Sequence, residues 1–367
     1  MLQRLLLLAG AAAAHEAAAE LGIQQDSHRN IFAYWNTGFP PLFQRRCLDN
    51  FRRYNPTWSV ILLNQESAPR AVGRHMLPLT FDEMSPQLQS DAVRLAALRV
   101  YGGVWSDITN LFVRMDALDG MWSEMIGWDK QMRGYSWLSN HIFESWFIMA
   151  VPGSSILAQW HDIFNAYYET RSQADQIGSN NLMSALNPTD RALIENSWWN
   201  SSMLDYLSIH ACFLRTIALD EWGGGENGTN HWQTQVHLDD GWRDGGYYVE
   251  QALCNWNGDC FRDRMFRDGL LSASEVATHT PLIKLNSVSM RTLFQGRTMP
   301  TDDDLWAIFD TPNGLLHQLL TPPADLSPTP PHEGAFTNRT ELKKPPQDAN
   351  SRGALLPPPD PLDRGVL

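Results

Sequence analysis

Asp91, Arg94 and Asp107 all fall within the stretch Gln89 to Phe112, and their types and spacing suit the binding of a polar, charged ligand. Asp91 and Arg94 are three residues apart in a predicted helix, so they share one helix face. Leucines lie near the same face, and charges beside apolar surface need partners to offset their desolvation. We therefore expect Asp91 to bind a ribose hydroxyl or a base edge and Arg94 to bind a phosphate. A helix-surface ion pair is the simpler alternative.

Asp107 follows the apolar pair Val104-Trp105 at the end of a predicted strand. An isolated Asp at such a position often only forms a turn. Together with Thr109, however, it offers oxygen ligands of the kind that Mn²⁺ or Mg²⁺ prefers. Tyr101-Gly102-Gly103 precedes the strand, and a glycine pair there either ends the helix or lets the backbone approach a ligand closely.

The elements that position these residues are predicted from apolar runs and turn signals. Compact strands are expected at 31–35, 58–63, 104–105, 141–151 and 281–285, and helices begin near Pro41, Pro86 and Ser154 or Ser155. This alternation favours an α/β fold with a mostly parallel sheet and crossover helices. Ligands bind beyond the carboxyl ends of the strands in such sheets, which is where Asp107 stands. Residues 180–220 are predicted to be mainly helical, and residues 223–246 an irregular loop or lid.

Composition limits the classes of partner. The chain has 367 residues, enough for one large domain with appendages or for two domains. Its net charge of −13 argues against a nucleic-acid backbone as the partner. An anionic ligand must therefore be held locally, by a metal ion, a few arginines or backbone N–H groups. Fifteen tryptophans are compatible with sugar stacking, although core packing explains most tryptophans in proteins.

Residues 1–20 resemble a signal peptide, with Arg4, an apolar run and the small residues Ala12 to Ala14. The alternative is an alanine-rich amphipathic helix in a cytoplasmic protein. Three glycosylation sequons begin at Asn200, Asn227 and Asn338, and they favour the secretory pathway, in the Golgi or endoplasmic reticulum lumen or outside the cell. No further membrane span is expected.

The cysteine count also favours the secretory pathway. Four cysteines, Cys47, Cys212, Cys254 and Cys260, are compatible with two disulfides, and the last two are close enough in sequence to clip a short loop.

The central motif resembles the nucleotide-sugar site of GT-A glycosyltransferases. D-x-x-R, Y-G-G, a hydrophobic pair and an Asp at a strand end are most similar to the capsular polysaccharide synthesis type, related to yeast-type mannosyltransferases and the glucosylating clostridial toxins. The segments AYWNTGFPPLFQRRC, NPTWSVILLN, ESWFIMAVPGS and THTPLIKL extend the resemblance over residues 28 to 290. It implies a GT-A, Rossmann-like fold with a mixed, mostly parallel sheet and a helical insertion. The expected organisation is a leader over 1–20, a catalytic domain over 28–300 and a Pro-rich disordered tail over 321–367.

The resemblance also implies roles at the matched positions. Trp35 would stack on the base, Asp91 would contact the ribose or donor sugar, and Arg94 would contact the sugar or diphosphate. Asp107 and Asp91 are the expected catalytic residues. Tyr101, Gly102, Gly103 and Trp105 join the expected substrate-binding set. Asp107, Thr109 and His279 are the expected ligands for Mn²⁺ or Mg²⁺, although Thr109 stands where many relatives carry a second Asp.

The function implied is metal-dependent transfer of a sugar from a UDP- or GDP-sugar donor to a glycan or glycoconjugate. Asp129, Glu144, Asp239 and Asp240 are candidates for roles on the acceptor side. His231, His237, Asp239 and Asp240 resemble a metal cluster, but a solvated polar loop is the expected explanation. The alternative function is a non-catalytic glycan- or nucleotide-binding relative that lost its metal chemistry through Thr109. A secreted hydrolase is not favoured, because the chain lacks G-x-S-x-G and H-E-x-x-H motifs.

Overall fold

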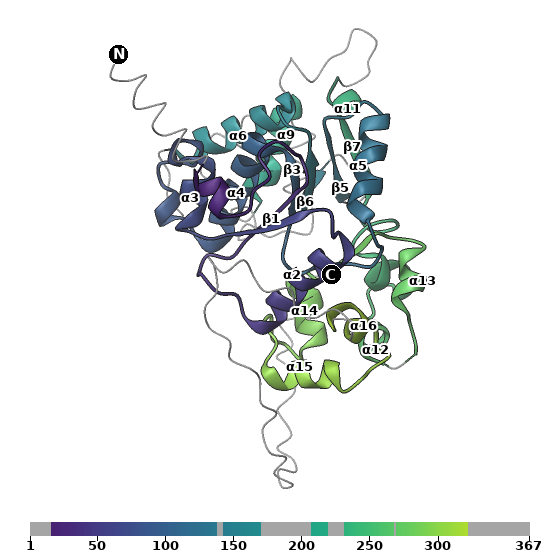
Figure 1. Ribbon diagram of the computed structural model, residues 1–367. Coiled ribbons are helices and arrows are strands. Elements are labelled where there is room, and N and C mark those ends of the chain that lie inside the picture. Colours follow the sequence, from purple (N-terminus) through teal and green to yellow (C-terminus); the bar gives the residue numbers. More distant parts are fainter. Residues whose placement is uncertain (1–15, 138–141, 170–206, 219–230, 268, 322–367) are drawn as a thin grey trace, which may run out of the picture.

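The protein, shown as a computed structural model in Figure 1, is organised around a six-stranded sheet. The structure describes residues 16–137, 142–169, 207–218, 231–267 and 269–321. The sheet order is β2-β1-β3-β6-β5-β7. The bounds of these strands are Asn30–Tyr34 (β1), Ser59–Leu63 (β2), Gly103–Ser106 (β3), Met132–Trp137 (β5), Ile142–Ala150 (β6) and Val236–Asp240 (β7). A separate antiparallel pair joins β4 (Asn110–Phe112) to β8 (Leu282–Lys284).

The strand directions make the sheet mixed and mostly parallel. β1 runs parallel to β2 and β3, and β5 runs parallel to β7, whereas β6 is antiparallel to both β3 and β5. The predicted α/β class with such a sheet is confirmed. The strands predicted at 31–35, 58–63, 104–105, 141–151 and 281–285 are all present within a few residues. The prediction of an irregular loop over 223–246 is wrong at β7, because a polar edge strand does not need the apolar alternation that marks a buried one.

Helices cover both faces of the sheet (Figure 1). One face buries the apolar sides of α3, α4, α6 and α9 against Phe32 and Trp105, and the other buries α2, α5, α12, α14, α15 and α16 against Ile31 and Val104. The α-helices are α2 (Leu42–Tyr54), α3 (Ser67–Val72), α4 (Pro86–Tyr101), α5 (Ala117–Gly127), α6 (Ser155–Tyr168), α9 (Ser208–Ala218), α11 (His231–Gln235), α12 (Gly258–Phe266), α13 (Ala273–Ala277), α14 (Ser287–Leu293), α15 (Asp302–Phe309) and α16 (Leu315–Leu320). The shorter helices are the 3₁₀ turns η1 (Arg74–Met76) and η2 (Phe81–Glu83) and the π-helix η5 (Val249–Leu253).

The packed chain continues past residue 300, because α16 lies against α2. Four leucines of α16 are buried in the same core cluster as the apolar residues of α2. At the other end, Ala17 and Ala18 are buried. Most of the predicted leader, the Pro-rich tail after residue 321 and the three sequons lie outside the described residues. Most of the predicted helical insertion apart from α9 also lies outside them.

Cys254 and Cys260 form a disulfide, which clips the short loop as predicted. Cys47 and Cys212 are free and buried on opposite faces of the sheet, so the structure holds one of the two disulfides that the cysteine count allowed. Among the described helices, none has the length and apolar character needed to span a membrane.

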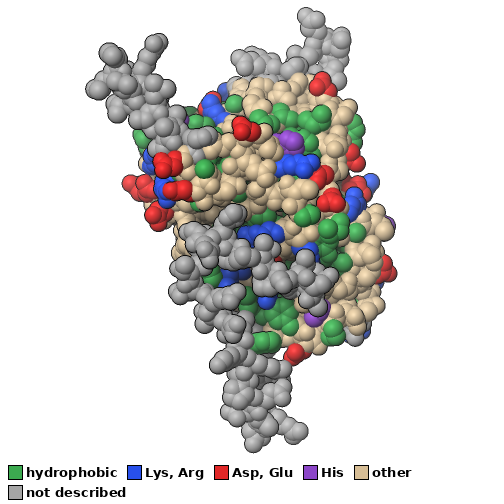
Figure 2. Space-filling view, in the orientation of Figure 1, with side chains coloured by type: hydrophobic (Ala, Val, Ile, Leu, Met, Phe, Trp, Pro, Cys, Tyr) green, Lys and Arg blue, Asp and Glu red, His purple; other side chains and the backbone are tan. Residues whose placement is uncertain are grey.

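Charge is distributed unevenly over the surface. On the face drawn in Figure 2, most acidic side chains lie toward the edges, whereas basic ones occur both at the edges and near the middle. A local cationic site is therefore compatible with the net charge of −13.

Candidate functional site

The candidate site lies at the carboxyl edge of β1 and β3. Ile31 pairs with Val104 and Phe32 with Trp105 in parallel register. Trp35 and Asp107, which follow these two strands, therefore stand at neighbouring strand ends, as the sequence predicts for a ligand-binding edge. An open depression of about 300 Å³ lies just beyond the carboxyl ends of β1 and β2 and is lined by Asn36, Gly38, Asn64, Gln65 and Glu66.

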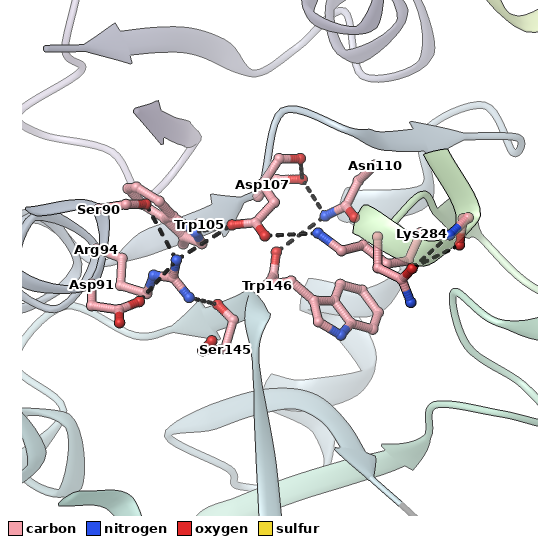
Figure 3. Close-up of polar contacts among 12 residues, drawn as sticks. Ser90, Asp91, Arg94, Trp105, Asp107, Asn110, Ser145, Trp146 and Lys284 are labelled. Carbon is pink, nitrogen blue, oxygen red and sulfur yellow. Dashed lines mark hydrogen bonds and ion pairs between the residues drawn. The ribbon is translucent and has the colours of Figure 1, made fainter. Parts of the chain in front are cut away.

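Asp107 is held by cationic and N–H groups on both carboxylate oxygens (Figure 3). Its Oδ2 accepts a 2.7 Å bond from Lys284 Nζ, and its Oδ1 accepts bonds from Trp105 Nε1 at 3.1 Å and Arg94 Nη2 at 3.4 Å. Burial alone would raise the pKa of Asp107, but Lys284 and Arg94 together hold it below its usual value. Asp107 is therefore an ionised carboxylate at neutral pH. Its side chain is 29% exposed, so Asp107 is the residue of the cluster that solvent reaches most easily.

Arg94 links the helix α4 to this carboxylate. Its guanidinium pairs with Asp91 at 3.1 Å, donates to the backbone oxygen of Ser145 at 2.6 Å and to Ser90 Oγ at 3.2 Å, and lies 5.0 Å over the ring of Trp105. The D-x-x-R spacing thus produces a buried pair, because α4 turns this face toward the sheet rather than toward water.

Asp91 is 6% exposed and acts on the site through Arg94. Burial raises the pKa of Asp91 to about 7, against the opposing effect of Arg94. Trp105 is also buried, and its indole positions Asp107. Asp91 and Trp105, both predicted as binding residues, thus position Arg94 and Asp107 from the buried side of the site.

Lys284 completes the cluster and was not predicted. β8 pairs with β4 so that Lys284 lies opposite Asn110, three residues after Asp107. Its side chain is 7% exposed, and its ammonium lies 5.8 Å from the ring of Trp146. A lysine inside the apolar run PLIKL was the available signal, because a buried ammonium requires an anionic partner.

The described residues around Asp107 do not provide a set of metal ligands. Thr109 stands two residues on, but His279 is exposed and stacks on Tyr248, at the end of the β4–β8 pair that lies away from Asp107. Across the described ranges, no three His, Cys, Asp or Glu side chains form a metal-binding group. A solvated polar loop was the expected explanation for His231, His237, Asp239 and Asp240, but the last three lie on β7, where Asp239 pairs with Arg133 and His237.

Electrostatics also oppose a divalent ion at Asp107 while its neighbours stay in place. Two unit charges 4 Å apart interact by about 4 kcal/mol at an effective dielectric constant of 20, and a divalent ion doubles that figure. A cation bound to Asp107 would meet both Lys284 and Arg94 at such a separation. The residues present therefore fit an anion better than Mn²⁺ or Mg²⁺.

Tyr101, Gly102 and Gly103 lie at the amino end of β3, whereas Asp107 follows its carboxyl end. The Tyr101 hydroxyl donates to the backbone oxygen of Ala71. A Cβ on Gly102 would lie 2.5 Å from the nitrogen of Pro152, and a Cβ on Gly103 would lie 2.7 Å from two backbone oxygens. These glycines permit close backbone packing at the start of the strand, and the structure does not bring the three residues to Asp107.

The four acceptor-side candidates are scattered. Glu144 lies on β6 near Lys284, and burial raises its pKa to about 7. Asp239 pairs with buried Arg133 at 2.8 Å, Asp240 accepts backbone bonds in the turn after β7, and Asp129 is exposed. Of the four, Glu144 is the one that the structure places beside the cluster.

Comparison with known proteins agrees with the resemblance seen in the motifs. Residues 13–177 match the family described as capsular polysaccharide synthesis protein. The chain is 28% identical over 258 residues to the glycosyltransferase afumC of Aspergillus fumigatus and 25% identical over 262 residues to the O-glycosyltransferase braB of Annulohypoxylon truncatum. Each alignment covers 63% of this chain, and 64% and 61% of the respective relative. The chain thus spans less than two thirds of the length of these relatives.

A third relative, the O-glycosyltransferase PaGT of Phomopsis amygdali, is 27% identical over 184 residues, which is 44% of each chain. Among solved structures, a PaToxG glycosyltransferase shares 12% identity and superposes with a TM-score of 0.31, covering 62% of this chain and 94% of that one. A score this low supports no comparison of the two sites.

Proposed function

We propose that this chain, which over residues 13–177 matches the capsular polysaccharide synthesis family, transfers a sugar from a UDP- or GDP-sugar to an acceptor hydroxyl. The observation that carries the proposal is the cluster of Arg94, Asp107 and Lys284 at the carboxyl edge of an α/β sheet, where the neighbouring strand β1 ends at Trp35. Relatives named as O-glycosyltransferases support a hydroxyl acceptor. A glycan or glycoconjugate is the acceptor class that we propose.

Each part of the site has a separate task in this proposal. Trp35 and the depression beyond the ends of β1 and β2 receive the base, and the cationic cluster receives the diphosphate. Positive charge fixed in place is most effective where negative charge grows on the departing group. Asp91 holds Arg94, and Trp105 holds Asp107, so neither needs to touch the substrate. In this proposal the cationic side chains act without Mn²⁺ or Mg²⁺, because Lys284 and Arg94 already contact both oxygens of Asp107.

The Cys254–Cys260 disulfide supports the secretory pathway as the compartment, since disulfides persist where the surroundings are oxidising. The alternative function, a nucleotide- or glycan-binding relative without turnover, is favoured by Thr109, which stands where a second Asp is expected.

The function is tested by screening UDP- and GDP-sugars with the full chain in the presence of Mn²⁺ and Mg²⁺, and by measuring nucleotide release with and without acceptor alcohols. We expect turnover of at least one donor. Arg94→Met should reduce turnover on the order of a hundredfold, because it removes a fixed cationic donor. Arg99→Met is the matched control, since Arg99 lies on the same helix but faces Asp162.

The two functions predict different results in this screen. Donor binding without release of nucleotide, in every donor tested, would support the non-catalytic relative. Equal losses of turnover in Arg94→Met and Arg99→Met would contradict the placement of the site at Arg94, but not the proposed sugar transfer.

A further inference from the structure

The ammonium group of Lys284 has unused hydrogen-bonding capacity. It donates to Asp107 Oδ2, and within the described part of the chain this is its single hydrogen-bond acceptor. An ammonium has three N–H donors, so two remain for a ligand. A side chain that is 7% exposed has little bulk water to satisfy them. An anion that enters beside Asp107 would do so.

The backbone around Lys284 is built to hold this lysine in place. Its N–H donates to the backbone oxygen of Gly246 at 2.8 Å, and β4 holds it from the other side. Gly246 approaches so closely that a Cβ there would lie 2.5 Å from the Cβ of Lys284. The ring of Trp146 lies 5.8 Å from the ammonium. The direction of the ammonium toward Asp107 is therefore set by three separate segments of the chain.

The charge balance of the cluster suits an anion. Lys284 and Arg94 both contact Asp107, and Arg94 is also paired with Asp91. The charges of Lys284, Arg94, Asp91 and Asp107 sum to zero when both carboxylates are ionised, and to one positive charge when Asp91 is protonated. Glu144, whose pKa burial raises to about 7, adds a negative charge beside Lys284 only when it is ionised. A bound diphosphate would meet two fixed cations, while Asp107 keeps them apart and oriented.

We propose that Lys284, oriented by Asp107 and assisted by Arg94, supplies the positive charge that binds the donor diphosphate and stabilises it as it leaves, in place of the divalent ion that the sequence resemblance implies. This inference rests on the proposed function. In the transfer step, the bond between the sugar anomeric carbon and the diphosphate oxygen breaks, and its electron pair stays on that oxygen. The acceptor oxygen bonds to the anomeric carbon, and its proton passes to the departing diphosphate. Lys284 remains protonated throughout and donates hydrogen bonds.

The test measures UDP and GDP binding to the full chain by calorimetry, once with EDTA and once with Mn²⁺ or Mg²⁺. We expect the wild-type affinity for the preferred nucleotide to change less than about threefold between these conditions. With EDTA, Lys284→Met should weaken binding at least about tenfold, and Lys284→Arg should lose less because it keeps the charge. Lys130→Met is the matched control, since Lys130 is a lysine on the loop before β5 that donates to the backbone oxygens of Gln233 and Thr234.

The outcomes separate this inference from the proposed function. Binding that requires Mn²⁺ or Mg²⁺, or that Lys284→Met leaves unchanged, overturns the inference while the glycosyltransferase proposal stands. Absence of UDP and GDP binding in every condition overturns the proposed function and the inference with it. Circular dichroism checks the fold of each variant. Should Lys284→Met fail to fold, the comparison of EDTA with metal on the wild-type chain still decides.

Discussion

At the scale of single residues, the site is a set of charges that stabilise one another in a largely buried place. Asp107 keeps a lowered pKa because two cations face it, whereas Asp91 has a raised pKa because burial outweighs its one cation. The same side-chain type thus differs in behaviour sixteen positions apart, through surroundings alone. Asp91 can therefore change its charge near neutral pH while Asp107 does not.

This difference predicts a pH dependence of stability. A carboxyl whose pKa is raised on folding, here from 3.8 to about 7, costs no stability below pH 4 and costs progressively more as the pH rises through 7. Asp91→Asn should therefore flatten the decline of the melting temperature between pH 4 and 7. The exposed Asp26→Asn is the control and should keep the wild-type decline. Parallel curves for the wild type and Asp91→Asn would mean that Asp91 does not titrate in this range.

At the scale of elements, the start of β3 fixes how the strand enters the sheet. Gly103 has a φ of 94°, and β1 approaches it so closely that no side chain fits. Pro152 covers Gly102 in the same way. These contacts set the register of β3 against β1 and so place Asp107 and Trp35 at neighbouring strand ends.

We therefore expect Gly103→Ala to destabilise the fold without acting directly on the ligand. Its cost should be about 3 kcal/mol or more, from left-handed backbone strain and from overpacking against the oxygens of His28 and Asn30. Gly153→Ala also has a positive φ but meets no atoms within 4 Å, so it should cost only about 1–2 kcal/mol. Urea unfolding measures both. Equal losses would show that the close approach at Gly103 is unimportant, and a specific loss of nucleotide affinity in folded Gly103→Ala would point to a binding role instead.

The elements also show which features the sequence could reveal. The apolar run that begins at Ile31 predicted β1, because burial on both faces leaves a continuous apolar signal. The polar strand Val236–Asp240 gave no such signal. Asp91, Arg94 and Asp107 were predicted because they lie close together in sequence. Lys284 was not, because 177 residues separate it from Asp107 and only the pairing of β4 with β8 brings them together.

At the scale of the whole molecule, the chain after β8 returns to support the strand pair that carries Lys284. Asn50 on α2 bonds to both backbone groups of Phe112 in β4 and donates to the backbone oxygen of Leu319 in α16. Arg53, one turn further along α2, donates to the backbone oxygens of Gln318, Leu319 and Thr321. The end of α16 is thereby tied through α2 to the core of the site.

Arg53→Met should therefore lower stability although it lies outside the site. The guanidinium satisfies carbonyl groups that a helix end leaves without intrahelical partners. A single charged hydrogen bond contributes about 1.5–3 kcal/mol, and bonds that share one half-buried guanidinium do not add in full. We expect a loss of about 2–3 kcal/mol in the free energy of unfolding, measured in urea. The neighbouring Arg52→Met is the control, because Arg52 is exposed and pairs only with Asp49 among the described residues. If α16 is a dispensable addition rather than part of the folded unit, the two variants will unfold at the same urea concentration.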